Sequence, residues 1–150
     1  MASKFSFRAH AHWKKACGSV EADSVNRIEF SAPPEFGGKD GYWTPETFFL
    51  AAVASCFVTT FRAIAQISKF EPVFLAVAAE GMVEKGEGGY AFTEVVLKPQ
   101  LTIKQSDDPQ RAMRLLEKTE HSCLVSRSIK AAVRMEAQIH VAEQKLADVA

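Results

Sequence analysis

Residues 33–57 decide the fold, and they read PPEFGGKDGYWTPETFFLAAVASCF. The first half of this stretch is rich in proline and glycine, which break regular structure and predict a loop. Thr44 is a good N-cap, Pro45 suits the first turn of a helix, and Glu46 complements the helix dipole there. We therefore expect a helix that begins near Thr44 and continues to about Ile67.

This expected helix is apolar around nearly its whole circumference. Its large apolar side chains are Phe48, Phe49, Leu50, Val53, Phe57, Val58 and Phe61. A helix of this kind has to be buried. One small sheet is too small to cover it on all sides, so we expect a second copy of the chain to complete the coverage in a homodimer.

Strands are predicted on both sides of this helix in the sequence. Period-two alternation, or enrichment in β-branched and aromatic residues, predicts strands at residues 5–13, 27–30, 72–84, 90–104 and 133–141. The glycine-rich turn at 85–89 makes the two longest strands a hairpin. An amphipathic helix begins at Asp108-Pro109, and a short helix follows around residues 122–129. This order predicts one α+β domain over residues 1–150, with antiparallel sheets packed around a buried central helix.

Composition limits the possible partners. The 18 basic residues balance the 18 acidic ones, so the net charge indicates neither a nucleic-acid partner nor an anionic membrane surface. The N-terminus lacks the apolar core of a signal peptide, and the apolar run from Phe48 to Val58 is too short to span a bilayer. We expect a cytoplasmic protein that acts on a small molecule.

The three cysteines are Cys17, Cys56 and Cys123, an odd number without CxxC spacing. This pattern predicts neither a disulfide framework nor a zinc site. In a reducing compartment, a cysteine that does more than pack is usually a nucleophile or a redox thiol. The search for function therefore narrows to thiol chemistry.

Taken from the residues alone, Cys123 is the better candidate for an ionised thiol. Ser122 can cap the short helix, which places Cys123 in a first turn where the dipole favours the thiolate, and Arg127 follows one turn later. Cys56 lies within the apolar helix, where burial raises the pKa and the helix itself supplies neither a cation nor a donor. Packing as a small hydrophobic residue is the simpler interpretation of Cys56, so we predict the lower pKa for Cys123.

Two further features have plain interpretations. Cys17 follows two lysines and precedes a glycine, so we expect it in an exposed turn after the first strand, without a functional role. His10 and His12 share one face of the first strand, but no third ligand stands near them in the sequence. They are interpreted as solvated polar positions.

Residues 33–57, together with EHSCLVSRSI at 120–129 and AHW at 11–13, resemble the OsmC/Ohr family of organic hydroperoxide reductases. The resemblance implies an intertwined homodimer that needs no metal or organic cofactor. It implies that Cys56 is the peroxidatic cysteine, that Cys123 resolves the sulfenic acid as a disulfide, and that Glu46 is the site carboxylate. A dithiol, of the lipoyl type or another, would then reduce the disulfide.

The sequence departs from the family pattern at one position. Ten residues of helix, about 15 Å, separate Glu46 from Cys56, so the carboxylate has to act through an intermediary. In the family this is an arginine from the turn after the first strand, but residues 13–18 here read WKKACG. Lys15 and Arg27 are the candidate replacements, although a lysine does not reproduce the bidentate fork of an arginine.

Three functions follow as hypotheses. The first is a thiol peroxidase, in which the apolar side chains of Phe48, Phe49, Val53 and Phe57 favour alkyl or lipid hydroperoxides. The second is a non-catalytic OsmC-like dimer that binds a small hydrophobic ligand, which the missing arginine favours. The third is a thiol protein that acts on some other electrophile.

Overall fold

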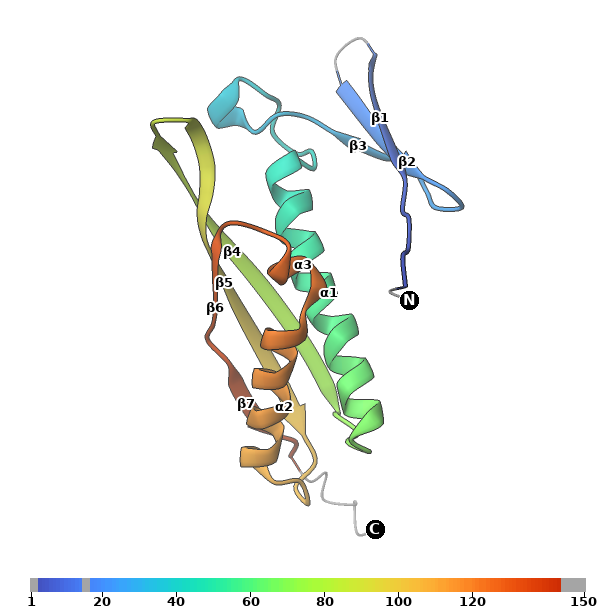
Figure 1. The fold of residues 1–150 in the computed structure, drawn as a ribbon, viewed down its shortest axis with the longest axis vertical. Coiled ribbons are helices and arrows are strands. Elements are labelled where there is room, and N and C mark those ends of the chain that lie inside the picture. Colours follow the sequence, from blue (N-terminus) through green and yellow to red (C-terminus); the bar gives the residue numbers. More distant parts are fainter. Residues whose placement is uncertain (1–2, 15–16, 144–150) are drawn as a thin grey trace, which may run out of the picture. The chain divides into compact units, whose positions relative to one another are not determined.

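The computed structural model describes residues 3–14 and 17–143 (Figure 1). Its contacts divide the chain into two compact units, Met1–Phe49 and Leu50–Ala150. Each unit is described by itself below. The two cysteines that the family resemblance singles out, Cys56 and Cys123, both belong to the second unit.

The first unit contains a three-stranded antiparallel sheet in the order β1-β2-β3. Its strands are β1 (Ala9–Lys14), β2 (Cys17–Ala22) and β3 (Ile28–Phe30). The predicted first strand starts later than expected, because Phe5 and Phe7 lie outside β1 and are exposed. Strand β2 was not predicted, since glycine and serine weaken its pattern.

Cys17 is the first residue of β2 and is half-buried, so its predicted place in an exposed turn is wrong. Beside it, Gly18 pairs with Phe30 of β3. A Cβ atom at Gly18 would lie only 2.4 Å from the Phe30 ring, so this position needs a glycine for the close approach. The sequence pattern predicted a turn at this glycine, whereas Gly18 makes a close contact with Phe30 inside a sheet.

The start of helix α1 (Pro45–Ile67) is confirmed in detail. The Thr47 amide donates to Thr44 Oγ1 at 3.1 Å, and the Thr44 amide donates to Thr47 Oγ1 at 2.8 Å. This reciprocal arrangement satisfies two backbone donors at the helix start, as a capping box does. A short 3₁₀ turn, η1 (Pro34–Phe36), lies within the loop that precedes the helix.

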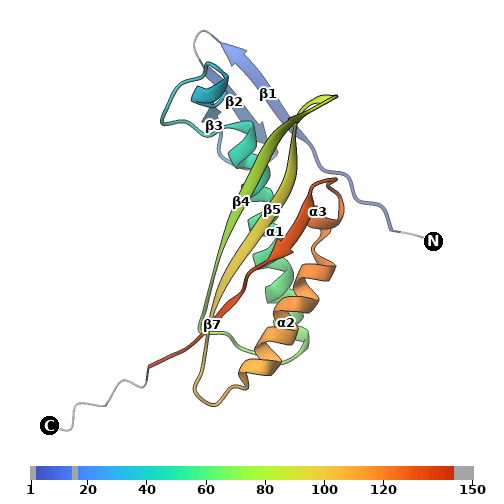
Figure 2. The same cartoon turned by 90° about the vertical axis from the view of Figure 1, so that its left-hand side faces the viewer.

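The second unit is built on one long strand. The predicted hairpin is confirmed as β4 (Phe74–Gly86) and β5 (Gly89–Ile103), which pair antiparallel. Strands β6 (Ala132–Met135) and β7 (Gln138–Val141) both pair with β5 in the parallel sense (Figure 2). The prediction of purely antiparallel pairing is therefore wrong here, because the chain returns to β5 through a helical crossover, which makes parallel neighbours.

One predicted strand, 133–141, is split into β6 and β7 at Glu136 and Ala137. The register is nevertheless continuous, since Glu94 pairs with Ala132 and Ile103 pairs with Val141. The break falls opposite Pro99 of β5, which has no N–H to donate to a neighbouring strand. A missing donor in the partner strand thus explains the interruption.

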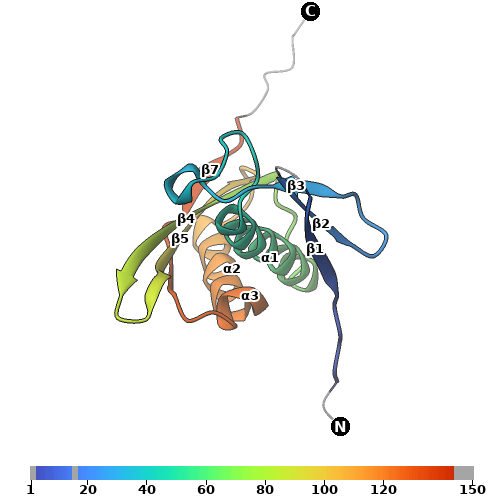
Figure 3. The same cartoon turned by 90° about the horizontal axis from the view of Figure 1, so that it is seen from above.

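Helices cover one face of this sheet (Figure 3). Helix α2 (Pro109–Ser122) is capped by Asp108, whose Oδ1 accepts from the Gln110 amide at 2.9 Å, and α3 (Leu124–Arg127) follows it. The largest fully buried side chains are Phe57, Phe61, Leu97, Leu101, Ile103 and Leu116. They come from α1, β5 and α2, and together they form the core of the unit.

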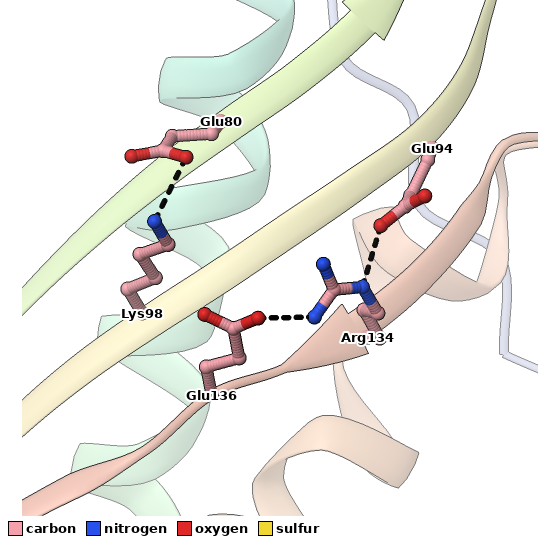
Figure 4. A network of polar contacts seen from close by, with 5 residues as sticks. All are labelled: Glu80, Glu94, Lys98, Arg134 and Glu136. Atoms are coloured by element: carbon pink, nitrogen blue, oxygen red, sulfur yellow. Dashed lines mark hydrogen bonds and ion pairs between the residues drawn. The ribbon is translucent and has the colours of Figure 1, made fainter.

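The opposite face of the sheet carries paired charges (Figure 4). Lys98 Nζ lies 2.9 Å from Glu80 Oε2, which joins β5 to β4. Arg134 of β6 pairs with both Glu94 and Glu136. These five exposed side chains are called the ion-pair ladder below.

The single chain buries only one side of α1. Its buried residues Val53, Phe57, Phe61 and Ala65 recur every fourth position. Residues on the other side are exposed, namely Ala52, Ser55, Thr59, Arg62, Ala63 and Gln66. The helix as a whole is 23 residues long and, by length and composition, could cross a membrane, a test that the core helices of soluble proteins also pass.

Candidate functional site

The second unit brings Cys56 and Cys123 together. Cys56 lies in the middle of α1, and Cys123 is the residue between α2 and α3, where it serves as the C-cap of one helix and the N-cap of the other. Figure 1 shows α3 beside the middle of α1, and Figure 3 shows the two helices next to each other as well. The two thiols are hydrogen-bonded to each other, and both cysteines are free.

The surroundings of Cys56 favour its thiolate. Burial is the largest single influence and raises the pKa of this thiol. Hydrogen bonds from the Val125 amide, the Cys123 thiol, the Thr60 hydroxyl and the Leu124 amide outweigh it, so the pKa of Cys56 falls below its ordinary value. These four donors carry no net charge.

The surroundings of Cys123 have the opposite effect. Burial raises the pKa of this fully buried thiol. The Ser126 amide partly offsets that shift, while the hydrogen bond to Cys56 and the charge of the Cys56 thiolate raise the pKa further. Cys123 therefore holds its proton in the pH range in which Cys56 has lost its own.

The predicted order of the two pKa values is wrong, and the reason is the position of the helix start. Cys123 itself is the N-cap of α3, so it does not occupy a first turn capped by Ser122. The free amides at the start of α3, those of Leu124 and Val125, act on the Cys56 sulfur. The donors that we expected to favour one thiolate thus favour the other.

Thr60 is a site residue that the sequence reasoning missed. Its Oγ1 lies 3.8 Å from the Cys56 sulfur, one helical turn further along α1. The statement that the helix supplies no donor to Cys56 is therefore wrong. A hydroxyl four residues after the cysteine was the signal that could have identified it, because residues at this spacing are neighbours on a helix surface.

Glu46 lies in the first turn of α1, and its Oε2 is buried without a hydrogen-bond partner among the described residues. Since α1 is one continuous helix from Pro45 to Ile67, Glu46 and Cys56 are about 15 Å apart along its axis. A buried carboxylate oxygen without a partner is costly, and a cationic or hydrogen-bond-donating partner would relieve that cost.

Neither predicted replacement for the arginine is seen to pair with Glu46. Lys15 lies outside the described residues. The Arg27 guanidinium donates to His12 Nε2 at 2.8 Å, and the Ser19 hydroxyl lies 3.0 Å from the same nitrogen. Arg27 is thus engaged within the first sheet.

His10 and His12 are both exposed, but the His12 ring also contacts Arg27 and Ser19. Among the described residues, no group of three or more His, Cys, Asp or Glu side chains could hold a metal ion. We also expected an apolar lining for a substrate. Val53 and Phe57 are instead fully buried in the core, and Phe48 stacks on Trp43 with ring centroids 5.3 Å apart.

Two adjacent thiols with pKa values pushed in opposite directions, on an α+β scaffold, define a candidate dithiol redox site. Residues 37–138 match the family described as OsmC-like protein, which is more than half of the chain. The chain belongs to this family.

Individual relatives cover nearly the whole chain. The peroxiredoxin OsmC of Escherichia coli is 25% identical over 138 residues, which are 88% of this chain and 95% of that protein. A structure from Vibrio cholerae, described as an OsmC-like protein of unknown function, has 23% identity and a TM-score of 0.82, over 90% of this chain and 100% of its own. A Legionella pneumophila protein, described as an organic hydroperoxide resistance protein OsmC, has 25% identity and a TM-score of 0.74, over 93% and 100%.

Proposed function

We propose that this protein is a cytoplasmic thiol peroxidase that reduces organic hydroperoxides to alcohols. One observation carries the proposal: Cys56 and Cys123 are hydrogen-bonded, with the pKa of Cys56 lowered and that of Cys123 raised. A thiolate is the nucleophilic form of cysteine, so Cys56 is the attacking residue. The names of the E. coli and L. pneumophila relatives support a hydroperoxide as the substrate.

The proposed reaction consumes one hydroperoxide and two protein thiols. The Cys56 thiolate attacks the terminal oxygen of the hydroperoxide, the O–O bond breaks, and the leaving alkoxide takes up a proton to become the alcohol. Cys123 then loses its proton and attacks the sulfur of the Cys56 sulfenic acid. A disulfide forms, and the hydroxyl leaves as water.

A dithiol reductant returns the protein to its starting state. One thiolate of the reductant attacks the disulfide and forms a mixed disulfide with one protein cysteine, while the other cysteine leaves as a thiol. The second thiol of the reductant then attacks its own sulfur in the mixed disulfide and displaces the remaining protein cysteine, so the reductant leaves as a disulfide and both protein cysteines are thiols again. A dithiol suits this step, because the second attack is intramolecular. A lipoyl-type compound is the proposed partner.

We further propose that the working form is a homodimer. The exposed side of α1 carries small residues such as Ala52, Ser55 and Ala63, which allow another helix to approach closely. The buried Glu46 oxygen, which has no hydrogen-bond partner in the part of the chain that the structure describes, supports a site that is completed by further groups. A basic side chain, from Lys15 or from elsewhere, is the proposed partner of Glu46.

The test is a thiol titration combined with substitution. The wild-type protein should lose two thiols per chain when it is mixed with one equivalent of cumene hydroperoxide, and a dithiol should restore them. Cys56→Ser should abolish peroxide consumption, whereas the matched control Cys17→Ser should leave it intact. Undiminished turnover by Cys56→Ser would refute the assignment.

A second candidate is a non-catalytic binder of a small hydrophobic ligand. It is favoured by the engagement of Arg27 with His12, which leaves no arginine seen beside Glu46. Such a protein would lose no thiols quickly to a stoichiometric hydroperoxide. The same titration therefore separates the two candidates.

A further inference from the structure

Two threonines follow Cys56 by one helical turn, and they make different contacts. The Thr59 hydroxyl donates to the Cys56 carbonyl oxygen at 3.1 Å. Thr60 Oγ1 instead lies 3.8 Å from the Cys56 sulfur. Thr59 is exposed and Thr60 is half-buried. Thr59 therefore contacts the backbone of Cys56, and its neighbour Thr60 contacts the side chain.

This division has a structural cause. A threonine hydroxyl inside a helix commonly donates to the carbonyl three or four residues earlier. For Thr60 the carbonyl four residues back is that of Cys56, which already accepts from Thr59. The Thr60 hydroxyl instead contacts the sulfur of the same cysteine. Partial burial strengthens this contact, because less water competes for the hydroxyl and for the sulfur.

We propose that Thr60 is a positioning residue, whose hydroxyl donates to the Cys56 thiolate and directs the sulfur toward the start of α3. This inference deepens the proposed function, because it names a neutral donor of this chain that helps to keep the attacking sulfur ionised. It agrees with the lowering of the Cys56 pKa by Thr60. The other groups that act on this sulfur are the Cys123 thiol, which titrates, and the Leu124 and Val125 amides, which do not.

The experiment measures the pH dependence of alkylation at Cys56 in a Cys17→Ser background. Iodoacetamide is added at a series of pH values, and labelling of Cys56 is followed by mass spectrometry of peptides. Thr60→Val should move the midpoint to higher pH and slow labelling at neutral pH roughly five-fold, because a hydrogen bond to a charged group is lost. Thr60→Ser, which keeps the hydroxyl, should restore the original midpoint.

Thr59→Val is the matched control, since it removes a neighbouring hydroxyl that does not face the sulfur. Its midpoint should equal that of the parent protein. Thr60→Ala, which adds no bulk, should shift in the same direction as Thr60→Val, so a folding defect in one variant does not decide the result. An unchanged midpoint in Thr60→Ala, or an equal shift in Thr59→Val, would overturn the inference.

Alkylation requires no peroxide, so the outcome of this test does not depend on whether the proposed function is correct. If Cys56→Ser abolishes peroxide reduction while the Thr60 variants keep their midpoint, the function stands and the role of Thr60 is refuted. If the midpoint shifts but the wild-type protein consumes no hydroperoxide, the role of Thr60 stands and the peroxidase proposal is refuted.

Discussion

The two faces of the sheet in the second unit carry different kinds of polar groups. On the solvent face, the ion-pair ladder places whole charges opposite one another, and each of its side chains remains exposed (Figure 4). On the helix side, the groups that act on Cys56 are hydroxyl, thiol and amide donors without net charge. Exposed ion pairs are screened by water and salt, whereas neutral donors around a partly buried sulfur act with little screening.

This difference shows that the number of charged groups around a residue is a poor guide to how its pKa is shifted in this protein. Burial raises the pKa of Cys123, but the neutral donors around Cys56 reverse the same effect of burial there. In the ladder, the shifted groups pair mainly with each other: the pKa of Lys98 is raised by Glu80, and that of Glu136 is lowered by Arg134. We therefore expect larger effects from changes on the helix side than from changes in the ion-pair ladder.

The largest expected effect concerns the two thiols. In a Cys17→Ser background, iodoacetamide at neutral pH should label Cys56 at least about ten-fold faster than Cys123, because Cys56 carries more thiolate and is the more accessible. Quantitative peptide mass spectrometry checks the ratio. Faster labelling of Cys123 than of Cys56 would contradict the assigned order of the two pKa values.

The next effect is a loss of packing on the helix side. Leu97→Ala should lower the free energy of unfolding by about 2–5 kcal/mol, because it removes a fully buried side chain of the core. Chemical denaturation measures the change. Lys98→Ala, at the next position of β5 and within the ion-pair ladder, is the matched control and should unfold almost as the wild type does.

A smaller effect is expected at Gly81 of β4. A Cβ atom there would lie 2.5 Å from the Phe92 ring and 2.9 Å from Leu50 Cδ2, so both side chains would have to shift. Gly81→Ala should therefore destabilise the protein by about 1–3 kcal/mol, which thermal unfolding can detect. Gly88→Ala, in the hairpin turn with no atom within 4 Å of the added Cβ, should be nearly neutral.

The smallest effect belongs to the ladder. The pKa of Glu136 is lowered by Arg134, so the pair adds stability at pH values above the ordinary glutamate pKa and loses it as the pH falls through the lowered value. Glu136→Gln should thus unfold slightly more readily than the wild type at neutral pH and low salt. The two proteins should converge in acid or in high salt, and a difference that persists in both conditions would contradict this account.

Local signals predicted the parts of the fold that depend on neighbouring residues. Thr44 and Pro45 marked the start of α1, and glycines marked the turn between β4 and β5. Parallel pairing of β6 and β7 was missed, because it depends on where the chain returns after α2. The break between these strands depends on Pro99, which lies in a different strand.

Sequence reasoning could name candidate site residues but could not predict their electrostatics. The family resemblance named Cys56, Cys123 and Glu46, and the structure brings the two cysteines together. The order of their pKa values was predicted wrongly, because the amides of Leu124 and Val125 act across space on a residue far away in the sequence. Thr60 was overlooked although it lies on the same helix, because its neighbour Thr59 makes the backbone bond that is typical of threonine.

The central place of β5 has a consequence for biosynthesis. This strand pairs with β4 on one side and with both β6 and β7 on the other, and the last two are made at the end of the described chain. A nascent polypeptide that has emerged only as far as α3 already contains Cys56 and Cys123 but leaves one edge of β5 open. Until β6 and β7 have left the ribosome, that edge presents unpaired backbone groups with which the strands of other chains can pair.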